Sequence, residues 1–527
     1  MTVRTQKKIP PRKAAGIFFL KTKNLLQFAE KSDTIYRSND KRGTNKGITK
    51  KMELLRRLYA PDYMLKKKQK RQEKYSTSEI YRSFIKVAWP ATAESVLLGL
   101  VNFIDSIMVS GEGHRAVAAV GLTSQPRFIF YAVFFAMNVG VTAIVSRRKG
   151  EERREDANRS LSQALSICLM LGVLLVGLAY AFSEPLLMFS GAKEDTIGDA
   201  MSYFRITMIG LFFTSISMVI NAAQRGAGNT RISMTTNMTA NIVNCIFNAL
   251  LINGLFFFPR LGVTGAAVAT LLGNITSCVM SIWSVAAINP KNHDRFLCQG
   301  LRGLFKFDRE NVTLICRISS SAAVEQVFMR LGFFMVSKMV AELSTVDFAT
   351  HTICMNITNL SFCFGDGLGV AASALVGQNL GKKRSDLSII YGKTAQRIGF
   401  LVASVLFCIF MFAGKFMIGL FMTEEAEAEQ IIVIGVRILR ILAVISPAQI
   451  SQVIFSGCVR GAGDTKYAAA VSLVTIAVER PLLTYLLCYT FGLGVIGAWI
   501  AMLIDQYLRL TLMAARFSGG KWEKIKV

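Results

Sequence analysis

Twelve long runs of predominantly apolar residues occupy the chain from about residue 84 to its C-terminal end. A helix needs about 20 such residues to cross the hydrocarbon core of a bilayer, whereas membrane-spanning strands are shorter and alternate in polarity. The runs therefore predict an all-α polytopic membrane protein. The predicted spans are 84–110, 116–145, 159–183, 198–223, 232–256, 262–287, 314–341, 346–377, 391–414, 430–458, 467–490 and 494–515. Charged residues make up only 18% of the chain, below the roughly 25% of ordinary soluble domains, which excludes a soluble multidomain enzyme.

Basic residues are concentrated in alternate loops. Lysine and arginine follow the second, fourth, sixth, eighth and tenth runs, whereas the loop after the ninth run is acidic. Because cytoplasmic loops carry the excess of cations, we expect both termini in the cytoplasm and the chain in the plasma (inner) membrane. Residues 1–80 add 22 basic residues against 7 acidic ones, which predicts a basic tail near anionic lipid, with Met52 as an alternative start. Since the charge lies in the tail and loops, no nucleic-acid partner is expected.

An internal repeat relates the two halves of the chain. Arg225-Gly-Ala-Gly-Asn-Thr-Arg231 recurs as Arg460-Gly-Ala-Gly-Asp-Thr-Lys466, and Leu261-Gly-Val-Thr-Gly-Ala266 recurs as Leu493-Gly-Val-Ile-Gly-Ala498. The offsets are 235 and 232, and Glu94 matches Glu325 at an offset of 231. The two glycine segments indicate tight turns between helices, because neither follows a strand nor carries the lysine of a phosphate-binding loop.

Each repeat contains six predicted spans, an even number, so both halves insert in the same direction. Parallel repeats of this kind predict two six-helix lobes with a substrate path between them. We expect a basic N-terminal tail at 1–82, a first lobe at 83–290, a cytoplasmic linker at 291–313, a second lobe at 314–517 and a short tail at 518–527. The molecule is expected to be a monomer in the lipid bilayer.

Several ordered motifs resemble those of the multidrug and toxic compound extrusion (MATE) transporters. They are Val101-Asn-Phe-Ile-Asp-Ser-Ile-Met-Val109, Ala119-Val-Gly-Leu122, the paired glycine turns, and Gly369-Val-Ala-Ala-Ser-Ala-Leu-Val-Gly-Gln-Asn-Leu-Gly381. Arg480-Pro481-Leu482 resembles the family's R-x-P-L element with one residue missing. The resemblance covers about 83–517. It implies two six-helix lobes and a secondary antiporter that exports organic cations or related amphiphiles in exchange for H⁺ or Na⁺, with no other cofactor.

The candidate ion-coupling residues are Asp105, Asn244, Asn248 and Glu325. A carboxylate inside the hydrocarbon is costly, and a proton or a cation can discharge it. Asp105 matches the first-helix aspartate that the family uses for coupling, and Glu325 matches a seventh-helix glutamate of one branch. Asn244 and Asn248 match family positions of an asparagine and an aspartate, so the second cannot titrate here. With Asp105 they either ligate Na⁺ through amide oxygens or only join helices.

Four further acids, Glu94, Asp366, Glu479 and Asp505, are candidate residues of the substrate cavity. Asp505 and Arg509 lie one helical turn apart, so the alternative for that acid is a structural ion pair. His351 resembles a family position and is interpreted as a hydrogen-bonded helix contact in preference to a proton relay. The ten cysteines are scattered without a CxxC pair and the three histidines lie far apart, so neither a metal site nor an enzyme is expected.

An alternative function is that of a flippase for a lipid-linked precursor or a polysaccharide, from a related two-lobed family. Such a protein would display several arginines or lysines in its cavity to meet phosphate. Several carboxylates lie well inside the predicted spans, which favours cationic cargo.

Overall fold

The computed structural model describes residues 64–65, 76–110, 114–190, 196–254, 259–286, 296–298, 304–419, 421 and 428–525. Most of the predicted N-terminal tail, including Met52, and most of the acidic loop at 424–429 lie outside the described residues. All twelve predicted spans coincide with helical segments. Eleven segments run uninterrupted or nearly so: α3 (Thr77–Ser110), α4 (His114–Gly150), α5 (Arg154–Ala181), α7 (Ile197–Gly226), α8 (Thr230–Asn253), α9 (Gly262–Val285), α10 (Arg309–Ala341), α11 (Thr345–Gly381), α12 (Ser385–Phe412), α14 (Ala428–Gly461) and α17 (Val495–Gly519).

Among the described residues, eleven helical segments are long and apolar enough to cross a membrane. The helix α8 (Thr230–Asn253) is not among these eleven, and the apolar end of that predicted span, residues 255–256, lies outside the described residues. Two short helices, α6 (Ser183–Phe189) and α13 (Gly414–Gly419), follow α5 and α12 at equivalent places in the two halves.

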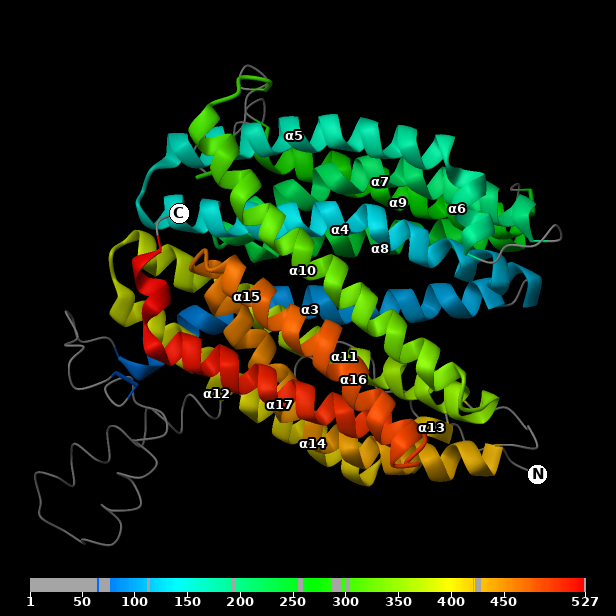
Figure 1. The fold of residues 1–527 in the computed structure, drawn as a ribbon. Coiled ribbons are helices and arrows are strands. Elements are labelled where there is room, and N and C mark those ends of the chain that lie inside the picture. The colour runs from blue at the N-terminus through cyan, green and yellow to red at the C-terminus, as the bar shows by residue number, and fades with distance from the viewer. Residues whose placement is uncertain are drawn as a thin grey trace, which may run out of the picture.

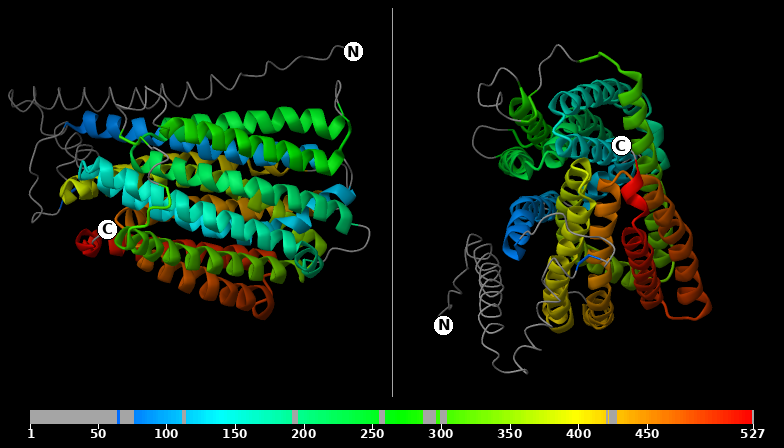
Figure 2. Two further views of the ribbon diagram at one scale, coloured as in Figure 1. Left: turned by 90° about the horizontal axis from the view of Figure 1, so that it is seen from above. Right: turned by 90° about the vertical axis from the view of Figure 1, so that its left-hand side faces the viewer.

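The helices form two layers, each with its own hydrophobic core (Figure 1). One core is built mainly from α4, α5, α7 and α9, and the other mainly from α11, α12, α14 and α17. The end-on view in Figure 2 shows the helices of the two halves gathered on opposite sides. The two lobes expected from the repeat are therefore present as two packing units.

The first long helix of each half crosses to the core of the other half. Phe84 and Ala88 of α3 are buried in the core of the second half, and Ile315 and Ile318 of α10 are buried in the core of the first. Phe84 and Ile315 are repeat equivalents, 231 residues apart. In Figure 1, α10 runs diagonally across the molecule from the α5 side toward α13. The two halves are thus interlocked by a symmetric exchange.

The eleventh predicted span is broken into α and π segments. It consists of α15 (Thr465–Ser472), the π-helix η4 (Leu473–Glu479), α16 (Arg480–Tyr485) and the π-helix η5 (Leu486–Thr490). Pro481 lies at the start of α16, where its missing N–H is tolerated. The equivalent helix of the first half, α8, is a regular α-helix without such segments. π segments are rare in proteins, and those that occur often lie at functional sites.

The predicted tight turns are confirmed and have the same geometry in both halves. Gly228 has φ +88° and Gly463 has φ +87°, a backbone conformation that favours glycine. The amide of Gly228 donates to the carbonyl of Arg225 at 3.0 Å, and that of Gly463 donates to Arg460 at 2.9 Å. Each turn fixes the place of the arginine that precedes it.

Candidate functional site

The two halves meet in a close seam at the C-terminal ends of α4 and α11. A Cβ atom added at Gly150 would overlap the backbone of Gln378, and one added at Gly381 would overlap the backbone of Arg147. The side-chain amide of Gln378 donates to the carbonyl of Gly226, at the end of α7, with a distance of 2.8 Å. This glycine seam brings the two lobes into backbone contact at the end of the bundle where the chain's C-terminus lies.

Beyond the glycine seam, the same face of α11 carries exposed polar side chains. These side chains are spaced three, four or seven residues apart, so they lie on one side of the helix. Counted away from the seam they are Asp366, Asn359, Asn356 and Thr352. All four are exposed, although α11 is packed on other sides by α3 and α14. Asp366 makes no hydrogen bond or ion pair with the described residues. We call this set the polar face of α11.

The corresponding face of α4 is aromatic. Phe135 and Phe128 are the repeat equivalents of Asp366 and Asn359, 231 residues apart in each case, and both are partly buried. Arg330 of α10 lies over the ring of Phe128, with 4.1 Å from its guanidinium carbon to the ring centroid. The faces of α4 and α11 that continue from the glycine seam therefore differ: α11 carries one exposed carboxylate and amides, and α4 carries aromatic rings.

Glu94 lies inside a hydrogen-bonded network rather than beside an open surface. It is 7% exposed, and one of its carboxylate oxygens accepts hydrogen bonds from Arg225 at 3.1 Å, Ser233 at 2.9 Å and Asn237 at 2.6 Å. Arg225 also donates to Asn138 of α4 at 2.9 Å. The pair of Glu94 and Arg225 thus joins α3, α4, α7 and α8, and the carboxylate has a cationic partner.

Glu325 has an equivalent partner in the second half. Its carboxylate accepts from Arg460 at 2.5 Å and from Ser472 at 2.9 Å, and its side chain is 2% exposed. Arg460 and Ser472 are the repeat equivalents of Arg225 and Asn237, both at an offset of 235. Burial of both glutamates is therefore compensated by an arginine from the glycine turn of the same half.

The asparagines of α8 contact neighbouring helices. Asn244 donates to the hydroxyl of Thr270 in α9 at 3.3 Å, and Asn248 donates to the side-chain oxygen of Asn244 at 3.3 Å. Both are buried, with exposures of 6% and 2%. Asp105 lies within α3, but its side chain is outside the described residues. The grouping of Asp105 with these asparagines stays a prediction.

In the second half, Arg480 of α16 and the α17 residues Asp505 and Arg509 form a buried polar cluster. Asp505 is 0% exposed and accepts hydrogen bonds from Arg480 and from Arg509, the latter at 2.8 Å. The side chain of His351 packs edge-on against Trp499, with 5.7 Å between ring centroids. The contact between Asp505 and Arg509 is therefore present. His351 packs against a neighbouring helix, but its buried Nδ1 has no hydrogen-bond partner among the described residues.

Glu479 differs from the other buried acids. Both of its carboxylate oxygens are shielded from solvent and have no hydrogen-bond partner among the described residues. It ends the π-helix η4 and directly precedes Arg480, whose guanidinium is held by Asp505. At an offset of 235, Glu479 is the repeat equivalent of Asn244. A carboxylate without a hydrogen-bond donor is costly to keep charged inside a bilayer.

The sequence analysis missed the arginine partners of the buried glutamates. Arg225 and Arg460 were interpreted only as cytoplasmic turn residues, yet their side chains reach back into the helices to Glu94 and Glu325. The sequence contained a signal for these pairs, because both the arginine and the glutamate recur at equivalent positions of the two halves. Arg330, within a predicted span, was also not singled out.

Comparisons with known proteins give a consistent result. The family model described as MatE matches residues 90–250 and 321–486, which is most of both halves. The chain is 28% identical over 454 residues to the "Probable multidrug resistance protein NorM" of Thermotoga maritima, covering 86% of this chain and 95% of that protein. It is 25% identical over 446 residues to the "Uncharacterized transporter YisQ" of Bacillus subtilis, covering 84% and 94%.

Solved structures share the fold. One, titled "Outward-facing conformation of a multidrug resistance MATE family transporter of the MOP superfamily", has a TM-score of 0.77 at 22% identity and covers 84% of this chain and 96% of its own. Another, with a TM-score of 0.77 at 23% identity and the same coverage, is titled "Reverse polarity of binding pocket suggests different function of a MOP superfamily transporter from Pyrococcus furiosus".

Proposed function

Because the chain belongs to the MatE family of multidrug efflux transporters, we propose that it is a secondary antiporter. It exports cationic or amphiphilic small molecules in exchange for H⁺ or Na⁺ by alternating access between its two lobes. Members of this family are transporters and not enzymes, and the many membrane-spanning helices make the chain a multi-pass membrane protein. Its proposed location is the plasma membrane, with both termini in the cytoplasm and the protein acting as a monomer.

The observation that carries the proposal is the pair of unlike faces on α11 and α4. Asp366 supplies one exposed negative charge, and Phe135 supplies aromatic surface on the opposite lobe, whereas the ring of Phe128 is already covered by Arg330. An organic cation with an aromatic body matches both faces, because aromatic rings and carboxylates both attract cations. Glu94, Glu325 and Asp505 each have an arginine partner, so Asp366 is the cavity acid of this proposal.

Alternating access is supported by the way the lobes meet. The glycine seam holds α4 and α11 in backbone contact at one end, which the basic loops assign to the cytoplasm. The reciprocal exchange of α3 and α10 lets one lobe rock against the other without separating from it. We infer a form closed toward the cytoplasm.

For the coupling ion, the second half offers Glu479 as a proton-binding residue. Its two oxygens have no donor to stabilise the charged form, whereas the neighbouring Asp505 is held by two arginines. In the first half, Asp105 with Asn244 and Asn248 remains the proposed ion site. The proposal therefore contains one site in each lobe, of different chemistry.

Efflux of ethidium from proteoliposomes tests the proposal. The proton gradient and the sodium gradient are collapsed separately, and dye export is followed by fluorescence. Loss of export when one gradient is collapsed supports antiport and identifies the coupling ion. Absence of export under either gradient, with folded protein in the bilayer, would contradict the drug-efflux proposal and favour the flippase, which is tested by translocation of a labelled lipid-linked substrate.

A further inference from the structure

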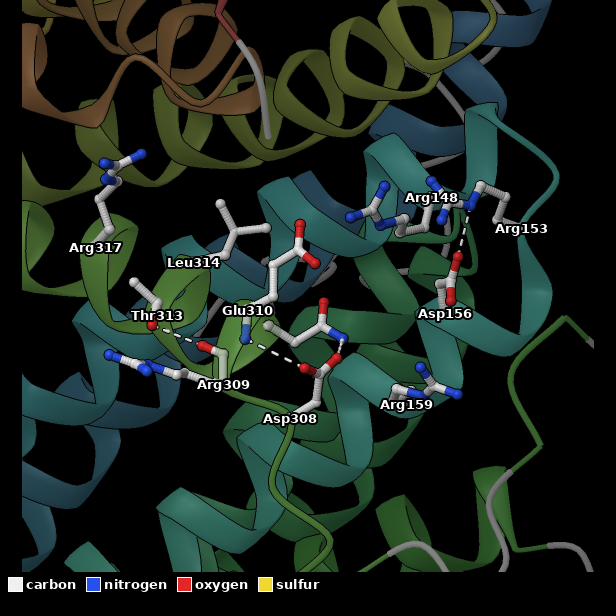
Figure 3. Close-up of a pocket in the computed structure, with 11 residues that line it drawn as sticks. Arg148, Arg153, Asp156, Arg159, Asp308, Arg309, Glu310, Thr313, Leu314 and Arg317 are labelled. Atoms are coloured by element: carbon white, nitrogen blue, oxygen red, sulfur yellow. Dashed lines mark hydrogen bonds and ion pairs between the residues drawn. The ribbon is translucent and has the colours of Figure 1, made fainter.

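A cavity of about 840 Å³ opens where α5 and α10 begin, at the end of the bundle that carries the glycine seam (Figure 3). Five arginines line it: Arg148, Arg153, Arg159, Arg309 and Arg317. The first three come from the end of α4 and the start of α5, and the other two from the first turns of α10. We call this cavity the arginine pocket. None of its residues belongs to the faces or networks described above.

Two of the three acidic residues that line the arginine pocket have partners or structural roles. Asp156 pairs with Arg153 at 2.6 Å. Asp308 caps α10, because its carboxylate accepts from the backbone amide of Glu310 at 3.2 Å and from the side chain of Asn311 at 2.8 Å. Only Glu310 is left without such a role among the acids that line the pocket.

Three of the arginines have no such partner. The guanidinium groups of Arg159, Arg309 and Arg317 make no hydrogen bond or ion pair with the described residues, and all three side chains are exposed. Arg148, in contrast, is held by Glu151 at 2.9 Å. The pocket therefore presents three guanidinium groups from two helices, with one acidic side chain to offset them. Arginine binds phosphate oxygens through its paired N–H groups, so this arrangement fits a phosphate.

Apolar surface beside the pocket indicates an amphiphile rather than a free ion. Phe305 and Phe307, just before α10, are 56% and 50% exposed. The backbone amide of Phe305 donates to the hydroxyl of Ser166 at 2.9 Å, which holds this segment against α5. Leu314 lines the pocket itself. Exposed apolar side chains beside basic groups can contact the acyl chains of a bound lipid while the basic groups contact its headgroup.

We propose that the arginine pocket binds the phosphate headgroup of an anionic glycerophospholipid, with the acyl chains along Phe305, Phe307 and Leu314. The basic loops place this end at the cytoplasmic leaflet, where anionic lipids attract basic groups. Arg317 also lines a second cavity, bounded by the turn Gly463–Lys466 of the other half. A headgroup bound by Arg317 therefore holds α10, the helix that packs on both lobes, against α5.

Thermal unfolding of the full-length protein in detergent tests the proposal. Short-chain phosphatidylglycerol should raise the unfolding midpoint saturably, and phosphatidylcholine of the same chain length should not. The triple variant Arg159→Gln/Arg309→Gln/Arg317→Gln should lose this stabilisation. The matched control is Arg82→Gln, an exposed arginine of α3 at the repeat equivalent of Thr313, which should respond like the unmodified protein.

Single variants keep the test valid if the triple variant does not fold. Arg159→Gln and Arg317→Gln lie on different helices, and each should weaken apparent lipid affinity by about tenfold, since each removes a charge-assisted contact. An undiminished response in both would overturn the site, as would an equal response to phosphatidylcholine. The same unfolding measurement is repeated with inorganic phosphate in place of the lipid. Saturable stabilisation by phosphate alone, at the same concentration as the lipid, would overturn the lipid assignment in favour of a soluble phosphate ligand.

Discussion

The two halves of the molecule share a buried glutamate and arginine pair, but they surround it differently. In the first half Arg225 contacts Glu94, Asn138 and Ser233, so that one guanidinium joins four helices. In the second half the positions of Asn138 and Ser233 are Gly369 and Ala468. Arg460 there keeps Glu325 as its partner, and its side chain is 27% exposed, against 11% for Arg225.

This difference indicates that the first half is the more rigidly tied of the two. The second half carries the π-helical segment, the unpartnered carboxyl group of Glu479 and the exposed Asp366. Hydrogen bonds between side chains help to hold helices together inside a membrane, and Arg460 makes fewer of them than Arg225 does. We expect the second half to undergo the larger internal rearrangement during transport.

Removal of the two arginines should give the largest effects and the clearest asymmetry. Arg225→Gln leaves Glu94 buried without its cation and should destabilise the protein by about 3–5 kcal/mol, whereas Arg460→Gln should cost less because that site is more exposed. Thermal unfolding of both variants in detergent measures the difference. The double variant Glu94→Gln/Arg225→Gln should recover part of the loss. Equal destabilisation by the two single variants would contradict the asymmetry.

Enlarging a seam glycine should impair transport strongly in either half. Gly150→Val and Gly381→Val each push a side chain into the backbone of the facing helix, so the lobes cannot close at this end. Export in proteoliposomes should fall to background while the protein remains inserted. Gly177→Val, at a glycine with open space around its Cβ position, is the control and should transport normally. Full activity of both seam variants would refute a requirement for this closure.

Glu479→Gln should abolish the dependence of export on the proton gradient if the second half carries the proton. Asn244→Gln, at the repeat equivalent position of the first half, keeps an amide and should preserve that dependence. Export driven by imposed pH gradients in the two variants distinguishes the halves. A proton-dependent Glu479→Gln variant would rule out this residue as the carrier.

Asp366→Asn should weaken the apparent affinity for a singly charged aromatic cation by about tenfold, since it removes the exposed charge of the polar face. The equivalent change in the other half, Phe135→Leu, should weaken it less, because an apolar side chain is retained. Concentration dependence of ethidium export measures both. An uncharged cargo should be unaffected by Asp366→Asn, and an equal loss for both cargoes would argue against a charge contact.

The smallest effect is expected at Asn248. Its hydrogen bond to Asn244 is long, at 3.3 Å, and hydrogen bonds between membrane helices average only about 0.6 kcal/mol. Asn248→Ala should therefore shift the unfolding midpoint slightly. If sodium-driven export is lost in this variant while stability is kept, the asparagines ligate the ion instead of only joining helices.

Much of the fold was accessible from pattern alone. A continuous apolar run long enough to cross a bilayer must satisfy its backbone hydrogen bonds internally, as a helix does, so the twelve helical segments could be predicted. The repeat could be predicted because its motifs recur at nearly constant spacing. The turn geometry at Gly228 and Gly463 also followed, because a short glycine segment between two helices leaves few conformations. The break in the eleventh span could not be predicted, since Leu473–Glu479 has no local signal such as a proline that would mark a π segment. In the structure this segment packs against α10 and α17.

By itself, then, the sequence determined the number and type of the helices, the duplication and the acids inside the membrane, because each depends on composition and local spacing. Only the tertiary structure decided which acids are neutralised and which are not. Glu94 and Arg225 are 131 residues apart in the chain, and Glu325 and Arg460 are 135 apart. Coulombic attraction and desolvation depend on distance in space, so Asp366 and Glu479 could be separated from the paired acids only after the helices were packed.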